Sequence, residues 1–213
     1  MIAGSRHSNV LATVVLATLP VTVACPRPSG DPASVAALGD SITARYRLAY
    51  SYPDLLGRWR NVPVQNFGVS GETTAQMLDR LREVLDGPSQ VVVILGGTND
   101  IARGMPVEET LRNLQTIAER VRDSGRRPVL VCPPPSGAFQ LDRAQALRAG
   151  LRDYAGRQGI VFVDPWPAME DPARRGWLRP ELALDVLHPN EQGQYVLAEQ
   201  IAKALGWPVP PPG

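Results

Sequence analysis

The sequence predicts one α/β domain, a three-layer α/β/α sandwich around a five-stranded parallel sheet. Two observations carry this prediction. Short apolar runs rich in β-branched residues alternate along the chain with amphipathic helical stretches. The runs are apolar on both faces, as strands are when helices cover both sides of a parallel sheet. Such an alternation favours right-handed crossovers between neighbouring strands. The domain is expected to span residues 34–207, with 208–213 as a disordered tail.

Each strand is expected where an apolar run is bounded by polar or turn residues, and each helix where apolar residues recur at helical spacing. The third helix shows this best, with Leu111, Leu114 and Ile117 on one face and charges on the other. The expected strands are Val35–Leu38, Val62–Asn66, Val91–Leu95, Pro128–Cys132 and Ile160–Val163. The expected helices are Ser51–Trp59, Thr73–Leu85, Pro106–Ser124, Leu141–Gln158 and Asn190–Leu205.

Residues 1–24 are typical of an export signal. The uncharged run Val10–Ala24 suits a signal-peptide core and is too short to cross a bilayer as a helix. Cys25 follows this run, and the residues up to Cys25 resemble a bacterial lipobox, although Thr22 stands where an aliphatic residue is usual. Either Cys25 is lipidated and attaches the protein to a membrane, or the chain is cleaved there without lipidation. Residues 25–33, rich in Pro, are expected to form a flexible tether.

The composition excludes several classes of function. Lys and Arg together number 22 and Asp and Glu 21, so the chain lacks the basic excess of a nucleic-acid binder. Cys25 and Cys132 make a poor disulfide pair, because one lies in the tether and the other in a predicted core strand. His7 and His188 are the only histidines, so no metal site or cofactor is expected.

Three polar segments each follow a predicted strand, and a fourth lies before the last predicted helix. Because the carboxyl ends of parallel strands share one edge of the sheet, the first three of these segments can converge there, and the fourth must fold onto that edge. They are Gly39-Asp40-Ser41, the stretch from Asn66 to Thr73, the stretch from Gly96 to Asp100, and Asp185-Val186-Leu187-His188.

These segments hold the groups that acyl transfer requires. Ser41 is a candidate nucleophile, His188 the base that takes its proton, and Asp185 the carboxylate that orients the base. Each residue alone also fits a structural role: Ser41 and Asp185 could cap a helix or a turn. The combination favours catalysis.

An oxyanion needs fixed hydrogen-bond donors, and the main-chain N–H groups of Ser41 and Gly68 and the side-chain amide of Asn99 are the candidates. Gly68 and Asn99 could equally be turn or cap residues. Asp100 is expected to cap the helix after the third strand. Asp40 is expected to bond nearby backbone. The aromatic residues Tyr46, Tyr50, Trp59 and Trp177 are expected to serve in packing.

The four segments resemble, in order, the signature blocks of the SGNH hydrolases, also called GDSL esterases and lipases. The resemblance runs from about Val35 to Leu205 and implies a flavodoxin-like sheet. It departs from the usual pattern at Ala44 and Gln194, outside the catalytic positions. The residues after which the family is named correspond to Ser41, Gly68, Asn99 and His188, and its Asp-x-x-His block matches Asp185.

We therefore expect an exported serine esterase that acts on a small-molecule or glycan acyl ester. An acyltransferase, a lysophospholipase or thioesterase, and a non-catalytic envelope-binding module are the alternatives. A nucleotide binder is disfavoured, since no Gly-rich phosphate loop with lysine occurs. The proline-rich segment Pro133–Gln140 is expected to narrow the crevice beside one strand end, which favours short acyl chains.

Overall fold

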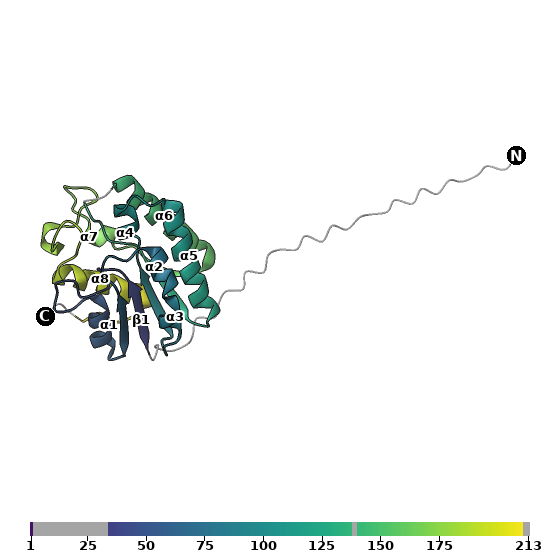
Figure 1. Ribbon diagram of the computed structural model, residues 1–213, viewed down its shortest axis with the longest axis horizontal. Helices are drawn as coiled ribbons and strands as arrows, with labels where there is room; N and C mark the ends of the chain where they lie inside the picture. The colour runs from purple at the N-terminus through teal and green to yellow at the C-terminus, as the bar shows by residue number, and fades with distance from the viewer. Residues whose placement is uncertain (2–33, 138–139, 211–213) are drawn as a thin grey trace.

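The protein folds into a parallel five-stranded sheet between two layers of helices (Figure 1). The computed structural model describes residue 1, residues 34–137 and residues 140–210. Cys25, the expected signal and the tether lie outside the described residues. Among the described residues, no helix is long and apolar enough to cross a bilayer. The strands are β1 (Val35–Gly39), β2 (Val64–Gly68), β3 (Val91–Leu95), β4 (Arg127–Val131) and β5 (Val161–Val163).

Strand β1 lies inside the sheet, between β2 and β3, in the order β2-β1-β3-β4-β5. All neighbouring strands are parallel, and the register pairs Gly39 at the end of β1 with Gly68 and Leu95. This is the strand order of the flavodoxin-like folds, whose ligands bind at the carboxyl edge beside the central strand. The predicted fold class is confirmed.

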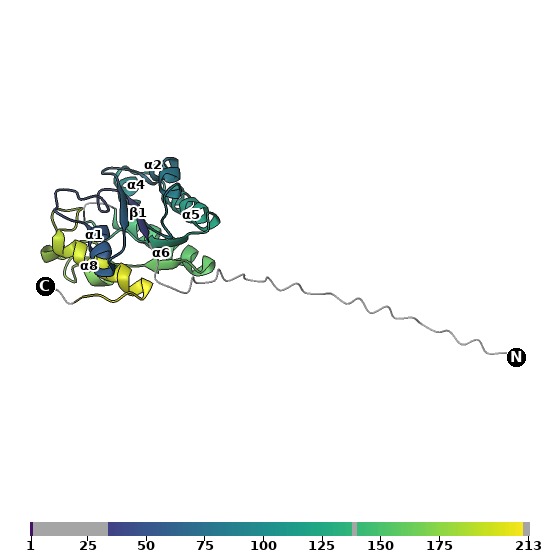
Figure 2. The same ribbon diagram turned by 90° about the horizontal axis from the view of Figure 1, so that it is seen from below.

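Alternate residues of β1 face opposite helical layers, as the two-residue period of a strand requires. Val35 and Ala37 pack with α1, α7 and α8, whereas Ala36 and Leu38 pack with the helices of the other face. Figure 2 shows α1 and α8 together on one side of β1 and α5 on the other. The first layer holds α1 (Tyr52–Arg60), α7 (Trp166–Met169) and α8 (Glu191–Leu205); the second holds α2 (Thr74–Asp79), α3 (Leu81–Leu85), α4 (Thr98–Ala102), α5 (Val107–Asp123) and α6 (Leu141–Gln158).

Most predicted boundaries differ from the observed ones by at most two residues, and two of the differences affect the site. Strand β2 begins at Val64, because the N–H of Val62 still donates to Gly57 O at the end of α1, and it extends through Gly68. The predicted helix over residues 73–85 is two helices that meet at Arg80. The short elements α4, α7 and a 3₁₀ turn (Pro180–Leu182) had no predicted counterpart as separate elements.

Candidate active site

Ser41 lies in a tight turn directly after β1. The N–H groups of Thr43 and Ala44 both donate to the carbonyl oxygen of Asp40, which bends the chain back on itself. Only glycine fits at position 39, because an added Cβ would lie 2.1 Å from Thr43 Oγ1 and 2.5 Å from Leu95 O. The turn therefore places Ser41 at the carboxyl edge of the sheet, as predicted, with 6% of its surface exposed.

His188 reaches the same place from the loop before α8. Its Nε2 atom lies 2.9 Å from Ser41 Oγ, and its Nδ1 atom lies 2.9 Å and 3.0 Å from the two carboxylate oxygens of Asp185. Because a carboxylate only accepts, Nδ1 carries the proton and Nε2 is free to accept from the serine hydroxyl. The structure thus joins the three predicted residues in one chain of hydrogen bonds.

Asp185 is fixed by its own loop. Its Oδ1 atom accepts hydrogen bonds from the backbone N–H groups of Leu187, at 2.9 Å, and His188, at 2.8 Å. Burial alone would raise the pKa of Asp185, but these backbone bonds and the imidazole of His188 outweigh it and lower the pKa below its usual value. The carboxylate therefore stays ionised where it faces the imidazole.

Asp40 precedes Ser41 and is fully buried. One of its carboxylate oxygens accepts from the N–H of Ile42 at 3.0 Å, which confirms the predicted bond to nearby backbone. The other oxygen, Oδ2, has no hydrogen-bond partner among the described residues. Burial raises the pKa of Asp40 to about 7, although the Ile42 bond opposes the rise.

The three expected oxyanion donors differ in whether they already donate a hydrogen bond. The N–H of Ser41 donates no hydrogen bond within the described part of the chain. Asn99 donates one of its two amide protons to Glu72 O at 2.8 Å, which leaves the other free. The N–H of Gly68, in contrast, already donates to Asn66 Oδ1 at 2.8 Å, so it is not available as the predicted oxyanion donor in this structure.

Gly68 has a packing role instead. A Cβ at this position would lie 2.2 Å from the backbone nitrogen of Ala44, so the bare backbone allows β2 to pack against the turn that carries Ser41. Gly71, next to the residue that holds Asn99, has a positive φ of 81°. Among the described residues its N–H has no hydrogen-bond partner, and neither has the N–H of Ser70, so this loop has free main-chain donors at Ser70 and Gly71.

An ion pair anchors this loop to the ends of two strands. Arg80 Nε donates to Glu72 Oε1 at 2.7 Å, and Arg80 Nη2 donates to Phe67 O at 2.7 Å and to Gly39 O at 3.3 Å. Both charged side chains are largely buried, with 14% and 12% of their surfaces exposed. Since the carbonyl of Glu72 holds the amide of Asn99, Arg80 connects the turn of Ser41 with the loop of Asn99.

One predicted role is wrong. Asp100 does not cap α4, whose N-cap is Gly97; its carboxylate accepts from the backbone N–H and the hydroxyl of Thr74 at the start of α2. This buried contact joins α4 to α2. Tyr46 was expected to serve in packing, and its ring packs on the imidazole of His188 in a stacked arrangement. Proximity in sequence to Ser41 was the only signal for the second contact.

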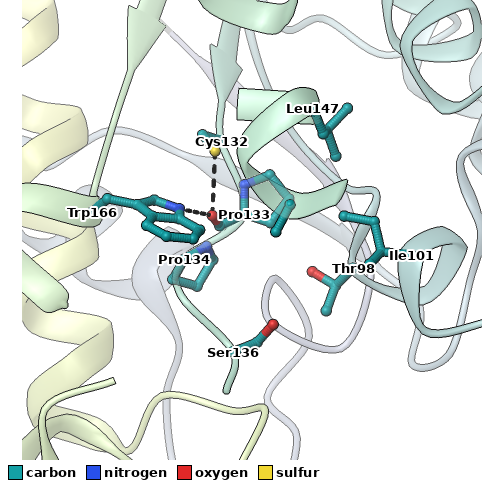
Figure 3. Close-up of a pocket in the computed structure, with 9 residues that line it drawn as sticks. Thr98, Ile101, Cys132, Pro133, Pro134, Ser136, Leu147 and Trp166 are labelled. Carbon is teal, nitrogen blue, oxygen red and sulfur yellow. Dashed lines mark hydrogen bonds between the residues drawn. The ribbon is translucent and has the colours of Figure 1, made fainter. Parts of the chain in front are cut away.

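A small cavity opens beside Thr98, the residue before Asn99 (Figure 3). Its volume of about 10 Å³ suits one water molecule. The Thr98 hydroxyl is buried and has no partner within the described residues. On the opposite wall, Trp166 Nε1 donates to Pro133 O at 2.9 Å and holds the chain after β4 in place. The cavity is therefore narrow and has a rigid wall.

Several known proteins are similar to this chain. The model of the GDSL-like lipase/acylhydrolase family matches residues 37–196. An arylesterase of Vibrio mimicus is 29% identical over 180 residues, covering 79% of this chain and 86% of the relative. Thioesterase 1/protease 1/lysophospholipase L1 of Escherichia coli K12 is 31% identical over 177 residues, covering 79% and 81%. The lipase/acylhydrolase of Enterococcus faecalis, a solved structure, superposes with a TM-score of 0.71 at 26% identity, covering 81% of this chain and 94% of that one.

Proposed function

Because the chain belongs to the GDSL-like lipase/acylhydrolase family and is a carboxylic ester hydrolase, we propose that Ser41, His188 and Asp185 form its catalytic triad. The observation that carries the proposal is the unbroken chain of hydrogen bonds from Ser41 Oγ through both ring nitrogens of His188 to Asp185. The preferred substrates are esters of short acyl chains.

Ser41 Oγ attacks the ester carbonyl carbon while its proton passes to His188 Nε2. Asp185 accepts from Nδ1 and stabilises the imidazolium that forms. As the tetrahedral intermediate collapses, Nε2–H gives its proton to the departing alcohol, and an acyl-serine remains. A water molecule, deprotonated by His188, then releases the acid by the same steps in reverse order.

The developing oxyanion requires donors that are not already occupied. The N–H of Ser41 and the second amide proton of Asn99 meet this condition. For the third donor we propose the N–H of Gly71 in place of Gly68, because the Gly68 N–H is bonded to Asn66. Glu72 is held by Arg80, and its carbonyl oxygen accepts from Asn99. Asn99 is therefore held next to the loop that contains Gly71.

Two features support a small, partly apolar acyl group. Apart from Met1, the exposed large apolar side chains of the described residues are Val69 and Val186. Both lie in the loops that carry the site, and Val186 stands between Asp185 and His188. The narrow cavity beside Thr98, the residue before Asn99, has no room for a long chain on that side of the site. A thioesterase or lysophospholipase activity is the second candidate, favoured by the Escherichia coli relative.

We further propose that the protein is exported, on the strength of the run Val10–Ala24. Mass spectrometry of the mature chain is expected to show an N-terminus at or near Cys25, with or without acyl groups. Recovery of the intact Met1 chain from the cytoplasm would contradict export.

A fluorophosphonate probe tests the nucleophile. It should label the wild-type protein and the Ser124→Ala variant, in which an exposed serine after α5 is changed, and it should leave Ser41→Ala unlabelled. Hydrolysis of p-nitrophenyl acetate by Ser41→Ala should fall by roughly 10⁴-fold or more, as removal of a triad member does elsewhere. Full labelling of Ser41→Ala would place the nucleophile at another residue.

A further inference from the structure

The aromatic ring of Tyr46 lies against one face of the His188 imidazole. The two ring centroids are 4.2 Å apart and the planes are inclined by 25°, which is a stacked arrangement. Tyr46 is half-buried. It is five residues from Ser41 in sequence, so the segment that leaves the nucleophile turn also supplies a cover for the base.

This segment is anchored on both sides of Tyr46. Before it, Arg45 Nε donates to Asp54 Oδ2 of α1 at 2.9 Å, and Thr43 O accepts from Ser51 Oγ at 2.8 Å. After it, Arg47 adopts a left-handed conformation with a φ of 56°, and the N–H of Leu48 donates back to Arg45 O at 3.3 Å, so a turn encloses Tyr46. The backbone of Tyr46 is therefore held, and its ring has a defined place on His188.

The imidazole uses its two nitrogen edges for Ser41 and Asp185, so only its faces remain for other contacts. With Tyr46 on one face, 12% of the His188 side chain is exposed. Resting on the proposed function, we propose that Tyr46 is a positioning residue that holds the His188 ring in plane and stabilises its imidazolium form through the π face.

The physical basis is the charge that appears during the reaction. His188 is neutral before attack and carries a positive charge once it has taken the Ser41 proton. The face of an aromatic ring is electron-rich and attracts a cation within about 6 Å of its centroid. Because the attraction is present only after proton transfer, it lowers the barrier without strengthening substrate binding, and it affects kcat more than KM.

The hydroxyl of Tyr46 has no hydrogen-bond partner among the described residues, so the ring alone should suffice, and Tyr46→Phe is the matched variant. Tyr46→Leu keeps an apolar side chain but removes the π face. Tyr50→Leu is a control, because Tyr50 belongs to the same segment but packs against the core with α1 and α8.

Steady-state hydrolysis of p-nitrophenyl acetate separates these variants. Tyr46→Phe should keep kcat within about twofold of wild type, whereas Tyr46→Leu should lower kcat by about 3- to 30-fold with KM unchanged. Tyr50→Leu, checked for folding by circular dichroism, should keep kcat. A wild-type kcat in Tyr46→Leu overturns the inference, and so does an equal loss in Tyr46→Phe. A rise in KM with kcat preserved also overturns it and makes Tyr46 a substrate contact.

A second measurement does not depend on activity. Histidine occurs only at positions 7 and 188, so the untagged full chain with His7→Gln has one histidine to observe by NMR. Ring protons that lie over an aromatic face resonate upfield. Tyr46→Leu should move the His188 ring protons downfield, and Tyr46→Phe should leave them in place; unchanged resonances in Tyr46→Leu overturn the stacking. A wild type that neither reacts with the fluorophosphonate nor hydrolyses the ester overturns the proposed function itself, whereas an active wild type indifferent to Tyr46 overturns only this inference.

Discussion

The Nε2 atom of His188 lies 2.9 Å from the Oγ atom of Ser41, although 147 positions separate the two residues. One side chain lies in the turn after β1, and the other lies in the loop before α8. The two loops are far apart in the sequence. The distance between the two side chains is therefore determined by the sheet and by the packing of α8 on the sheet. The proposed proton transfer from Ser41 to His188 depends on this contact.

Replacing Asp185 with Asn should reverse the hydrogen bond to His188. The Asn oxygen can still accept from the N–H groups of Leu187 and His188, so its NH₂ group faces Nδ1. Nδ1 must then accept, and the proton moves to Nε2, where it prevents the ring from accepting from Ser41. We expect kcat to fall by up to about 10⁴ at unchanged thermal stability. Steady-state kinetics and a thermal melt check both, and an unchanged kcat would eliminate the orienting role.

Asn99→Ala should remove one oxyanion donor. The expected result is a loss of about 10²–10³ in kcat with little change in KM, because the interaction forms in the transition state. Asn113→Ala is the matched control, since this half-buried amide donates to Thr74 Oγ1 and lies outside the proposed donors. If the Asn99 variant raised KM and kept kcat, Asn99 would be a substrate contact instead.

Asp40 should make the fold less stable as the pH rises from about 4 to about 7. The pKa of its buried carboxyl is raised to about 7, above the unfolded value of 3.8, so in this range the unfolded chain ionises while the folded chain stays neutral. One pKa unit corresponds to about 1.4 kcal/mol, so the effect amounts to a few kcal/mol in the free energy of unfolding.

Asp40→Asn should lose less stability over the same interval, and the exposed Asp79→Asn should behave as wild type. Urea unfolding at about pH 4 and about pH 8 measures the difference. The depressed pKa of Asp185 acts at lower pH, because the stability it contributes is lost only as the pH falls below about 4. Equal pH dependence in Asp40→Asn and wild type would show that Asp40 is not the source.

Acyl chain length should decide between the two candidate substrate classes. With p-nitrophenyl esters we expect kcat/KM to be highest from acetyl to butyryl and to decline beyond hexanoyl. A long apolar trough would add about 0.8 kcal/mol for each buried methylene, and the described residues beside Thr98 leave space for about one water. A steady rise to dodecanoyl would instead favour the lysophospholipase-type activity.

The alternation of apolar runs and helical stretches predicted the sheet, and the edge rule for parallel strands brought Ser41 and Asn99 together. Two contacts could not be predicted, because both depend on local geometry that no periodic pattern encodes. The Gly68 N–H is occupied because it donates to the side-chain oxygen of Asn66. The amide nitrogen of Asn66 in turn donates to Thr43 O. The stacking of Tyr46 depends on a non-repetitive segment with a left-handed residue at Arg47.

The same reasoning accounts for the elements that were missed. Helix α4 is five residues long, so it shows too little periodicity to be recognised. The division between α2 and α3 occurs at Arg80, whose side chain bonds the ends of β1 and β2. An amphipathic pattern continues across such a break, since both helices face the same core.

The placement of β1 inside the sheet, with His188 supplied by the last loop before α8, has a consequence for biosynthesis. A ribosome delivers Ser41 early and His188 nearly at the end, because a domain emerges from its N-terminus first. If these residues are the proposed nucleophile and base, a nascent chain that ends before His188 carries Ser41 without a partner and should be inert toward esters. On that assignment hydrolysis should begin only when the final segment docks, and its onset should report that the whole domain has finished folding.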